Sequence, residues 1–225
     1  MSYEKDMLNN CIEILRLDIK NLVYMIIEQY KNVIYSLKTM DSNLALEVIK
    51  NDGEINRKAE EIDYETIQVI ESLQPKTSYL RRLITINKLA YELERIADYA
   101  KNIAEYVITG KKMNVGKTNE FISEFDKMFD LILSMLEANL QAFLNEDKNL
   151  AREALLMDNE IDEIYKDNFN DLLIRFKNNT DEYEQNMISR ALVLNKQIER
   201  SGDHLTNISE QILYLIKGKS KLGEK

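Results

Sequence analysis

The sequence contains a tandem repeat, and no other feature constrains the fold as much. The segment DGEIN, which begins at Asp52, matches DNEID at Asp158, 106 residues later. A longer pair, ERIADYAKNIAE from Glu94 and ERSGDHLTNISE from Glu199, is offset by 105 residues and shares six of its twelve positions. Self-similarity at a nearly constant offset indicates one structural unit that is present twice.

Apolar spacing predicts three long helices in each copy, because apolar residues recur every three or four positions along most of the chain. Asp41 or Ser42 can cap the second helix, and Pro75 ends it, since proline cannot continue a helix. Short connections place consecutive helices antiparallel. We therefore expect an all-α protein of two tandem antiparallel three-helix bundles. The predicted helices cover residues 5–40, 41–73, 78–109, 120–144, 148–177 and 182–217.

The boundary between the two bundles is predicted from composition. The segment GKKMNVGKTN, from Gly110 to Asn119, is the only glycine-rich polar connector in the interior of the chain. Such a cluster is typical of a loop between two periodic segments. We therefore place the first three-helix repeat at residues 1–112 and the second at residues 113–225.

The charge balance and the termini exclude several classes of protein. The chain has 39 acidic and 30 basic side chains, a formal net charge of −9, and its lysines and arginines are interspersed. This pattern argues against nucleic-acid binding. The single cysteine, Cys11, excludes an intrachain disulfide. The polar N-terminus does not resemble a signal peptide, and the longest apolar run, Val23 to Ile27, is too short to span a membrane. We expect a cytoplasmic protein without membrane insertion.

The predicted third helix of each copy carries a Glu-x-x-x-Asp pair. Glu94 and Asp98 lie on the same side of the helix, because successive residues turn by about 100°. Like charges at this spacing destabilise a helix by about 0.2–0.5 kcal/mol. Either water and Arg95 screen the two carboxylates, or they hold a cation. Taken alone, the motif favours the solvated alternative.

The antiparallel arrangement adds side chains from the neighbouring helix. Asp52 and Asp98 both stand 23 residues from Pro75, and Asn56 and Glu94 both stand 19 residues from it. Residues at equal separation from a helical turn lie at the same height, because both helices rise 1.5 Å per residue. The turn near residue 180 levels the second copy in the same way. Each copy is therefore expected to bring four oxygen-bearing side chains together.

We call these sets the first and the second acidic cluster. The first consists of Asp52, Asn56, Glu94 and Asp98, and the second of Asp158, Asp162, Glu199 and Asp203. Clustered carboxylates repel each other unless they are protonated or neutralised by a cation. Their oxygen atoms suit Mg²⁺, Mn²⁺, Ca²⁺ or iron. The alternative is a hydrated acidic surface completed by Arg95 and Arg200.

Motifs of known enzymes are missing from the sequence. The only histidine, His204, cannot supply the two Glu-x-x-His motifs of a ferritin-like di-iron core, and Tyr99 occupies its position in the first copy. There is no Ser-His-Asp order, P-loop or G-x-G-x-x-G. We expect His204 to lie at a boundary between polar and apolar surroundings, and we expect a protein that is not an enzyme.

The two motifs, ERIADYAKNIAE and ERSGDHLTNISE, together with QPKTSYLRRL and DNEID, resemble the PhoU family of phosphate-uptake regulators along essentially the whole chain. The resemblance implies two PhoU-like, spectrin-type three-helix repeats and a cytoplasmic negative regulator of the phosphate regulon that forms a homodimer. It also implies two partners, the ATPase subunit of the phosphate ABC transporter and a sensor histidine kinase. Some members of the family carry clusters of iron or other metals at these motifs.

By this resemblance, Glu94, Asp98, Glu199 and Asp203 are the best metal ligands, with the other members of the two clusters beside them. The cofactor would be Fe, Zn, Mn or Mg. Two positions depart from the family pattern. Asn56 replaces a carboxylate, and Ala97 stands where the second copy has Gly202. We therefore expect the first cluster to hold metal less tightly or to hold fewer ions.

Two other functions stay open on the sequence alone. One is a helical scaffold of the same type that regulates a different transporter or persistence, with both acidic clusters merely solvated. The other is a metal-storage or redox protein that uses the carboxylates as ligands. Metal content of the untagged protein distinguishes the second alternative, and the neighbourhood of the gene distinguishes the first.

Overall fold

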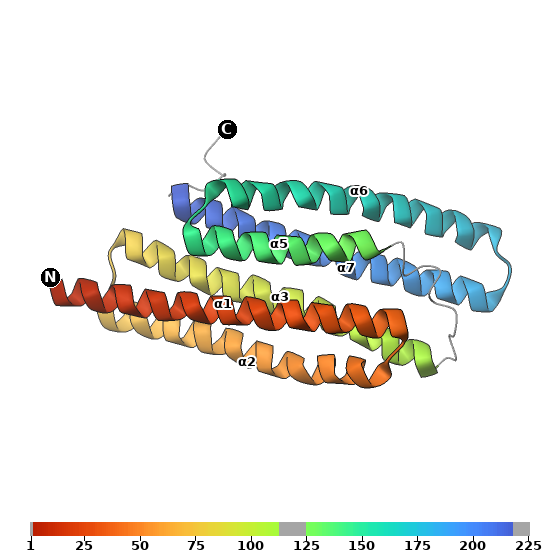
Figure 1. Cartoon of the computed structure of the whole chain (residues 1–225), viewed down its shortest axis with the longest axis horizontal. Coiled ribbons are helices and arrows are strands. Elements are labelled where there is room, and N and C mark those ends of the chain that lie inside the picture. Colours follow the sequence, from red (N-terminus) through yellow and green to blue (C-terminus); the bar gives the residue numbers. More distant parts are fainter. Residues whose placement is uncertain (1, 113–124, 218–225) are drawn as a thin grey trace.

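The structure, a computed structural model, describes residues 2–112 and 125–217, and every regular element in these ranges is a helix (Figure 1). The first three helices form one antiparallel bundle and the last three form a second, which confirms the predicted fold class. The helices are α1 (Ser2–Thr39), α2 (Ser42–Leu73), α3 (Thr77–Lys112), α5 (Asp126–Asn145), α6 (Lys148–Asn178) and α7 (Glu182–Lys217).

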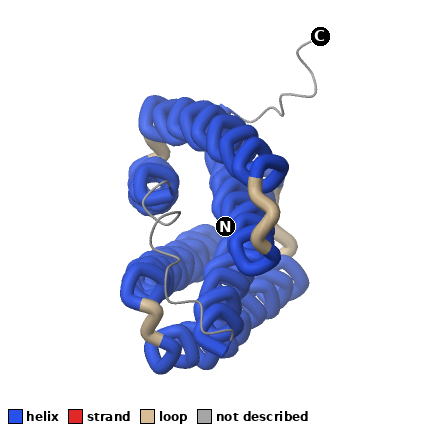
Figure 2. Tube along the Cα trace, turned by 90° about the vertical axis from the view of Figure 1, so that its right-hand side faces the viewer, coloured by secondary structure: helices blue, strands red, loops and turns tan. Residues whose placement is uncertain are grey.

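Four helices form one layer in the order α2, α3, α7, α6, since α3 packs against both α2 and α7, and α7 packs against α6. Helix α1 lies over α2 and α3, and helix α5 lies over α6 and α7, as Figure 1 shows. Figure 2 looks along the helices and shows the two repeats as two groups. The two helices that carry the Glu-x-x-x-Asp motifs, α3 and α7, therefore meet at the centre of the molecule.

Helix α1 shows why the sequence forms this bundle. Its apolar residues, at intervals of three and four, are almost fully buried from Leu8 to Leu37, which places one continuous face against α2 and α3. Tyr30 is fully buried, and its hydroxyl lies 2.5 Å from Ser201 Oγ on α7 and donates to Ile96 O on α3 at 3.3 Å. One side chain thus connects the two repeats through their core.

The repeat extends to the caps of the helices. Asp41 is the N-cap of α2, and its carboxylate accepts hydrogen bonds from the backbone N–H groups of Asn43 and Leu44. Asp147 caps α6 in the same way, by accepting from Asn149 and Leu150. A side-chain oxygen at this position satisfies backbone donors that the helix itself leaves unpaired. The predicted cap at Asp41 is confirmed.

Helix α3 is longer than predicted. It continues through Gly110 to Lys112, whereas the sequence predicts an end at residue 109. Gly110 is buried, and a Cβ atom there would lie 3.1 Å from both Arg190 Nη2 and Met40 Cε. The absence of a side chain therefore allows close packing and does not end the helix. The rest of the predicted connector and residues 120–124 of the predicted fourth helix lie outside the described residues, so the boundary at 112/113 stays a prediction.

The outer surface of the helices is largely charged, with scattered apolar side chains. Leu17, Tyr35, Tyr64 and Leu156 are each more than half exposed. Of the helices that the structure describes, none combines the length and the apolar character that crossing a membrane requires. Cys11 lies half-buried on α1 and has no disulfide partner, as expected for a single cysteine.

Candidate functional site

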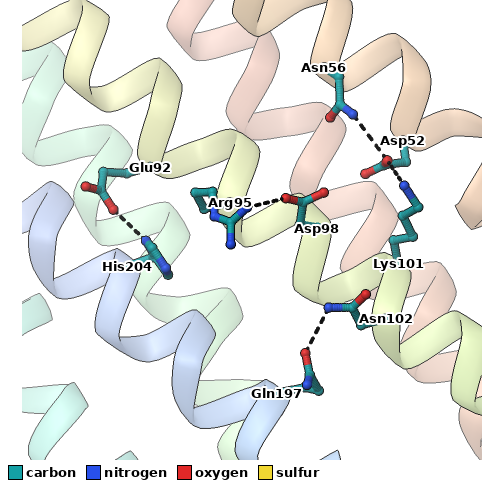
Figure 3. Close-up of polar contacts among 9 residues, drawn as sticks. All are labelled: Asp52, Asn56, Glu92, Arg95, Asp98, Lys101, Asn102, Gln197 and His204. Carbon is teal, nitrogen blue, oxygen red and sulfur yellow. Dashed lines mark hydrogen bonds and ion pairs between the residues drawn. The ribbon is translucent and has the colours of Figure 1, made fainter.

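The register between α2 and α3 agrees with the prediction from the turn. Asp63 and Asn87, each 12 residues from Pro75, face each other, and the Asn87 amide donates a hydrogen bond to the Asp63 carboxylate. The first acidic cluster lies along the same junction, with Asp52 and Asn56 on α2 and Glu94 and Asp98 on α3 (Figure 3). The second acidic cluster lies along the junction of α6 and α7.

Asp52 is the most deeply buried member of the first acidic cluster, with 2% of its side chain exposed. Lys101 reaches across from α3 and places its Nζ 2.9 Å from Asp52 Oδ2, as Figure 3 shows. The amide of Asn56 also donates to Oδ2, at 3.4 Å. The hydrogen bond to Asp52 raises the pKa of Lys101, so this lysine is charged at neutral pH. The carboxylate of Asp52 is therefore neutralised within the chain.

The other two carboxylates of the first acidic cluster lie at its outer edge. Arg95 Nη1 lies 2.9 Å from Asp98 Oδ2, one turn along the same helix. Burial raises the pKa of the Glu94 carboxyl, and the negative charge of Asp98 raises it further. The pKa of Glu94 shows that a negative charge at this position is unfavourable, although Arg95 partly offsets the effect.

The second acidic cluster is built around Asp158 on α6. Burial raises the pKa of the Asp158 carboxyl, while the hydroxyl of Thr206 lowers it. The carboxylates of Asp162, Asp203 and Glu199 raise this pKa further, so all four acidic side chains interact. The four residues therefore lie near one another, as the sequence predicts.

Basic side chains accompany the three outer carboxylates of the second acidic cluster. The pairs are Lys196 with Glu199 at 2.5 Å, Lys166 with Asp162 at 3.5 Å and Arg200 with Asp203 at 3.8 Å. Each pair lies within one helix, and each basic side chain is between 38% and 65% exposed. Exposed pairs of this kind contribute little to stability, because water and salt screen them.

Asp158 is in a different situation from Asp52, its counterpart in the first repeat. Thr206 occupies the position of Lys101, 105 residues later. Among the described residues, no lysine or arginine forms an ion pair with Asp158. The two clusters therefore differ in their central carboxylate: Asp52 has a cation of the chain beside it, and Asp158 has a hydroxyl.

The fit of the two clusters to a metal ion differs accordingly. Within the described residues, no group of three or more His, Cys, Asp or Glu side chains converges closely enough to be a preformed metal site. The second acidic cluster nevertheless supplies four carboxylates around a central Asp158 that the chain does not neutralise, which suits a hard cation. In the first acidic cluster, the ammonium of Lys101 already occupies that role. The eight predicted ligands stay a prediction.

Lys101 is the residue that reasoning from the sequence missed. The signal was present: Lys101 stands seven residues after Glu94, two helical turns, and therefore on the same side of α3. The register that brings Asp52 level with Asp98 also brings Asp52 within one turn of Lys101. A long side chain reaches one turn along a neighbouring helix.

His204 lies between the two repeats. Its Nδ1 is 2.6 Å from Glu92 Oε2 on α3, and the amide of Asn207 donates to the same oxygen at 3.1 Å. Its ring also lies 5.5 Å from the ring of Tyr99. Figure 3 shows this contact beside a second one between α3 and α7, in which Asn102 donates to Gln197. His204 is thus a polar contact residue at the repeat interface, which agrees with its predicted place at a boundary.

Gly202 is expected to be essential for the second acidic cluster. A Cβ atom at this position would lie 2.7 Å from Asp158 Oδ1 and 3.4 Å from Ile161 Cδ1, so that α6 or the carboxylate would have to shift. Gly202→Ala is expected to lower the free energy of unfolding by about 1–3 kcal/mol, the range for an overpacked site. Urea denaturation measures this change.

Gly53 provides a matched control in the first repeat, beside Asp52. It lies in the interior of α2 with no atom within 4 Å of a Cβ at its position. Gly53→Ala is expected to raise the free energy of unfolding by about 0.5–1 kcal/mol, because alanine has the higher helix propensity. Equal effects of the two substitutions would contradict the close approach at Gly202.

Comparison with known proteins gives concordant results. The family model described as the PhoU domain matches residues 19–107 and 125–212. A phosphate-specific transport system accessory protein PhoU homolog of Clostridium acetobutylicum is 32% identical over 193 residues, which cover 85% of this chain and 86% of that protein. The corresponding PhoU homolog 1 of Thermotoga maritima is 29% identical over 209 residues, covering 93% and 88%. The crystal structure of PhoU from Pseudomonas aeruginosa has a TM-score of 0.87 at 27% identity and covers 94% of this chain and 99% of that chain.

Proposed function

Because the chain belongs to the PhoU family, we propose that it is a regulatory accessory protein of a phosphate-specific transport system, and that it lowers phosphate uptake and the expression of phosphate-responsive genes when phosphate is plentiful. The observation that carries this proposal is the match of the family model to both repeats. Membership of this family agrees with the prediction of a regulatory protein that is not an enzyme.

The proposed action is binding without turnover. The partners are the ATPase subunit of the phosphate ABC transporter and a sensor histidine kinase, and this chain would relay the state of the transporter to the kinase. Both partners expose their ATP-using domains to the cytoplasm, which is where we place the protein. The long helices support this role, because they offer extended charged faces to partner proteins. A homodimer is part of the proposal, and light scattering of the purified protein tests it.

Metal binding is proposed for the second acidic cluster. Asp158, Asp162, Glu199 and Asp203 would hold a divalent cation through their carboxylate oxygens. The support is the raised pKa of Asp158, whose ionisation is opposed by its burial and by the other three carboxylates. A bound cation supplies the positive charge that would neutralise this repulsion and brace α6 against α7.

Deletion of the gene in its native host tests the regulatory role. The expected result is that phosphate uptake and a phosphate-responsive reporter stay active in phosphate-rich medium, and that the wild-type gene on a plasmid restores repression. Cross-linking followed by affinity purification at high and at low phosphate identifies the partners. The expected partners are the transporter ATPase and the kinase.

Two results would contradict this proposal. Unchanged phosphate uptake in the deletion strain, with capture of the ATPase subunit of a different transporter, would favour the scaffold alternative. Altered metal tolerance with normal phosphate regulation would favour the metal-storage or redox alternative. A strain that carries an unrelated deletion and the same plasmid is the control for effects of growth rate.

A further inference from the structure

The two repeats differ at one position that decides how the central carboxylate is neutralised. In the first repeat Lys101 extends from α3 to Asp52 on α2, with 2.9 Å between Nζ and Oδ2. In the second repeat the same position of α7 is Thr206, which interacts with Asp158 on α6 through a hydroxyl. The exchange of lysine for threonine removes one positive charge from an otherwise similar setting.

The geometry of Lys101 distinguishes it from the other basic residues of both clusters. Arg95, Lys166, Lys196 and Arg200 each pair with a carboxylate three or four residues away on their own helix. Lys101 instead spans two helices and ends on a carboxylate that is 98% buried, since Asp52 exposes only 2% of its side chain. An ammonium held against a buried carboxylate in this way takes the place that a metal cation would occupy.

A second difference between the repeats acts in the same direction. Gly202 leaves open the space in which Asp158 Oδ1 lies, at 2.7 Å from the position of a Cβ atom. In the first repeat the corresponding residue is Ala97, which is fully buried. The methyl group of Ala97 fills the corresponding space beside α2. The first repeat thus lacks both the opening and the unneutralised charge that a cation requires.

We propose that Lys101 is a built-in substitute for a metal cation, so that the first repeat is braced permanently by its own ammonium group and only the second repeat responds to metal. This inference rests on the proposed metal site in the second acidic cluster. It assigns to the chain one metal-independent half and one metal-responsive half, although the two halves share the same fold and motif.

Electrostatics supports this division. A divalent cation that entered the first acidic cluster would have to displace the ammonium of Lys101 or lie beside it as a like charge. It would also find an amide, Asn56, where the second repeat offers the carboxylate of Asp162. The first cluster therefore presents three carboxylates and one ammonium, whereas the second presents four carboxylates around Asp158.

Reciprocal exchange of the two residues tests the inference. The variants are Lys101→Thr and Thr206→Lys, and Mn²⁺ is the probe, because its preference for oxygen ligands suits these carboxylates and its bound fraction is measured by electron paramagnetic resonance. Hydrogen exchange with and without Mn²⁺ shows which helices become protected. Lys88→Thr is the matched control, since Lys88 is an exposed lysine of the same helix.

In the wild type, Mn²⁺ is expected to slow exchange in α6 and α7 and to leave α2 and α3 unchanged. Thr206→Lys is expected to abolish Mn²⁺ binding and to leave α6 and α7 protected without metal. Lys101→Thr is expected to lose protection in α2 and α3, which Mn²⁺ then restores at least in part. Lys88→Thr is expected to match the wild type. Circular dichroism verifies that each variant is folded.

Three results would overturn the inference. They are protection of α2 and α3 by Mn²⁺ in the wild type, full Mn²⁺ binding by folded Thr206→Lys, and no Mn²⁺ binding by the wild type. None of them decides the regulatory role, which the deletion strain tests separately. Conversely, loss of the regulatory proposal together with Mn²⁺ protection confined to α6 and α7 would leave the inference intact.

Discussion

Lys101→Met is expected to lower the free energy of unfolding of the metal-free protein by about 3 kcal/mol, near the low end of the range for breaking a buried ion pair. The reason is that Asp52 keeps its charge and its burial while it loses the ammonium 2.9 Å away. The effect is placed at the low end because 32% of the Lys101 side chain is exposed, so water partly replaces the lost charge. Urea denaturation, followed by circular dichroism, measures the change.

A surface ion pair provides the control for this prediction. Arg57 and Glu61 lie 2.9 Å apart on α2, and the Arg57 side chain is 68% exposed. Arg57→Met is expected to change the stability by less than about 0.5 kcal/mol. Asp52→Asn added to Lys101→Met is expected to restore part of the loss, because an amide costs less to bury than an unpaired carboxylate. Equal losses in Lys101→Met and Arg57→Met would show that the contact with Asp52 is not a stabilising one.

Tyr30→Ala is expected to lower the free energy of unfolding by about 4 kcal/mol, the cost of removing a large aromatic side chain from a core. Tyr30 is fully buried, and its hydroxyl contacts Ile96 on α3 and Ser201 on α7. The substitution therefore leaves a cavity where the two repeats meet and removes a hydrogen-bond partner of Ser201. Denaturation by urea is the measurement, and a transition in two steps would show that the repeats have come apart.

Tyr35 is the matched control, because it is a tyrosine of the same helix with 60% of its surface exposed. Tyr35→Ala is expected to change the stability by less than about 0.5 kcal/mol. Tyr30→Phe is expected to lose about 1–2 kcal/mol, which separates the contribution of the hydroxyl from that of the ring. A small effect of Tyr30→Ala would mean that the repeats are held together mainly by the contacts of α3 with α7.

The sequence by itself determined the helices, their order and the duplication. Apolar residues at intervals of three and four predict each helix, Asp41 and Pro75 mark where the second begins and ends, and the near-constant offset predicts two copies. It also determined the register of neighbouring helices, as the contact between Asp63 and Asn87 confirms. These features follow from local geometry, since a short turn fixes the relative height of the two helices that it joins.

Only the tertiary structure decided which helices of different repeats meet and which charges are neutralised. The layer order α2, α3, α7, α6 brings together helices that no turn connects, so no spacing in the chain predicts it. The contact between Lys101 and Asp52 depends on the path of a long side chain, and the place of Gly202 depends on how closely α6 approaches α7. Two copies with the same motif therefore have different central charges, because charge balance is set by side chains that meet across helices.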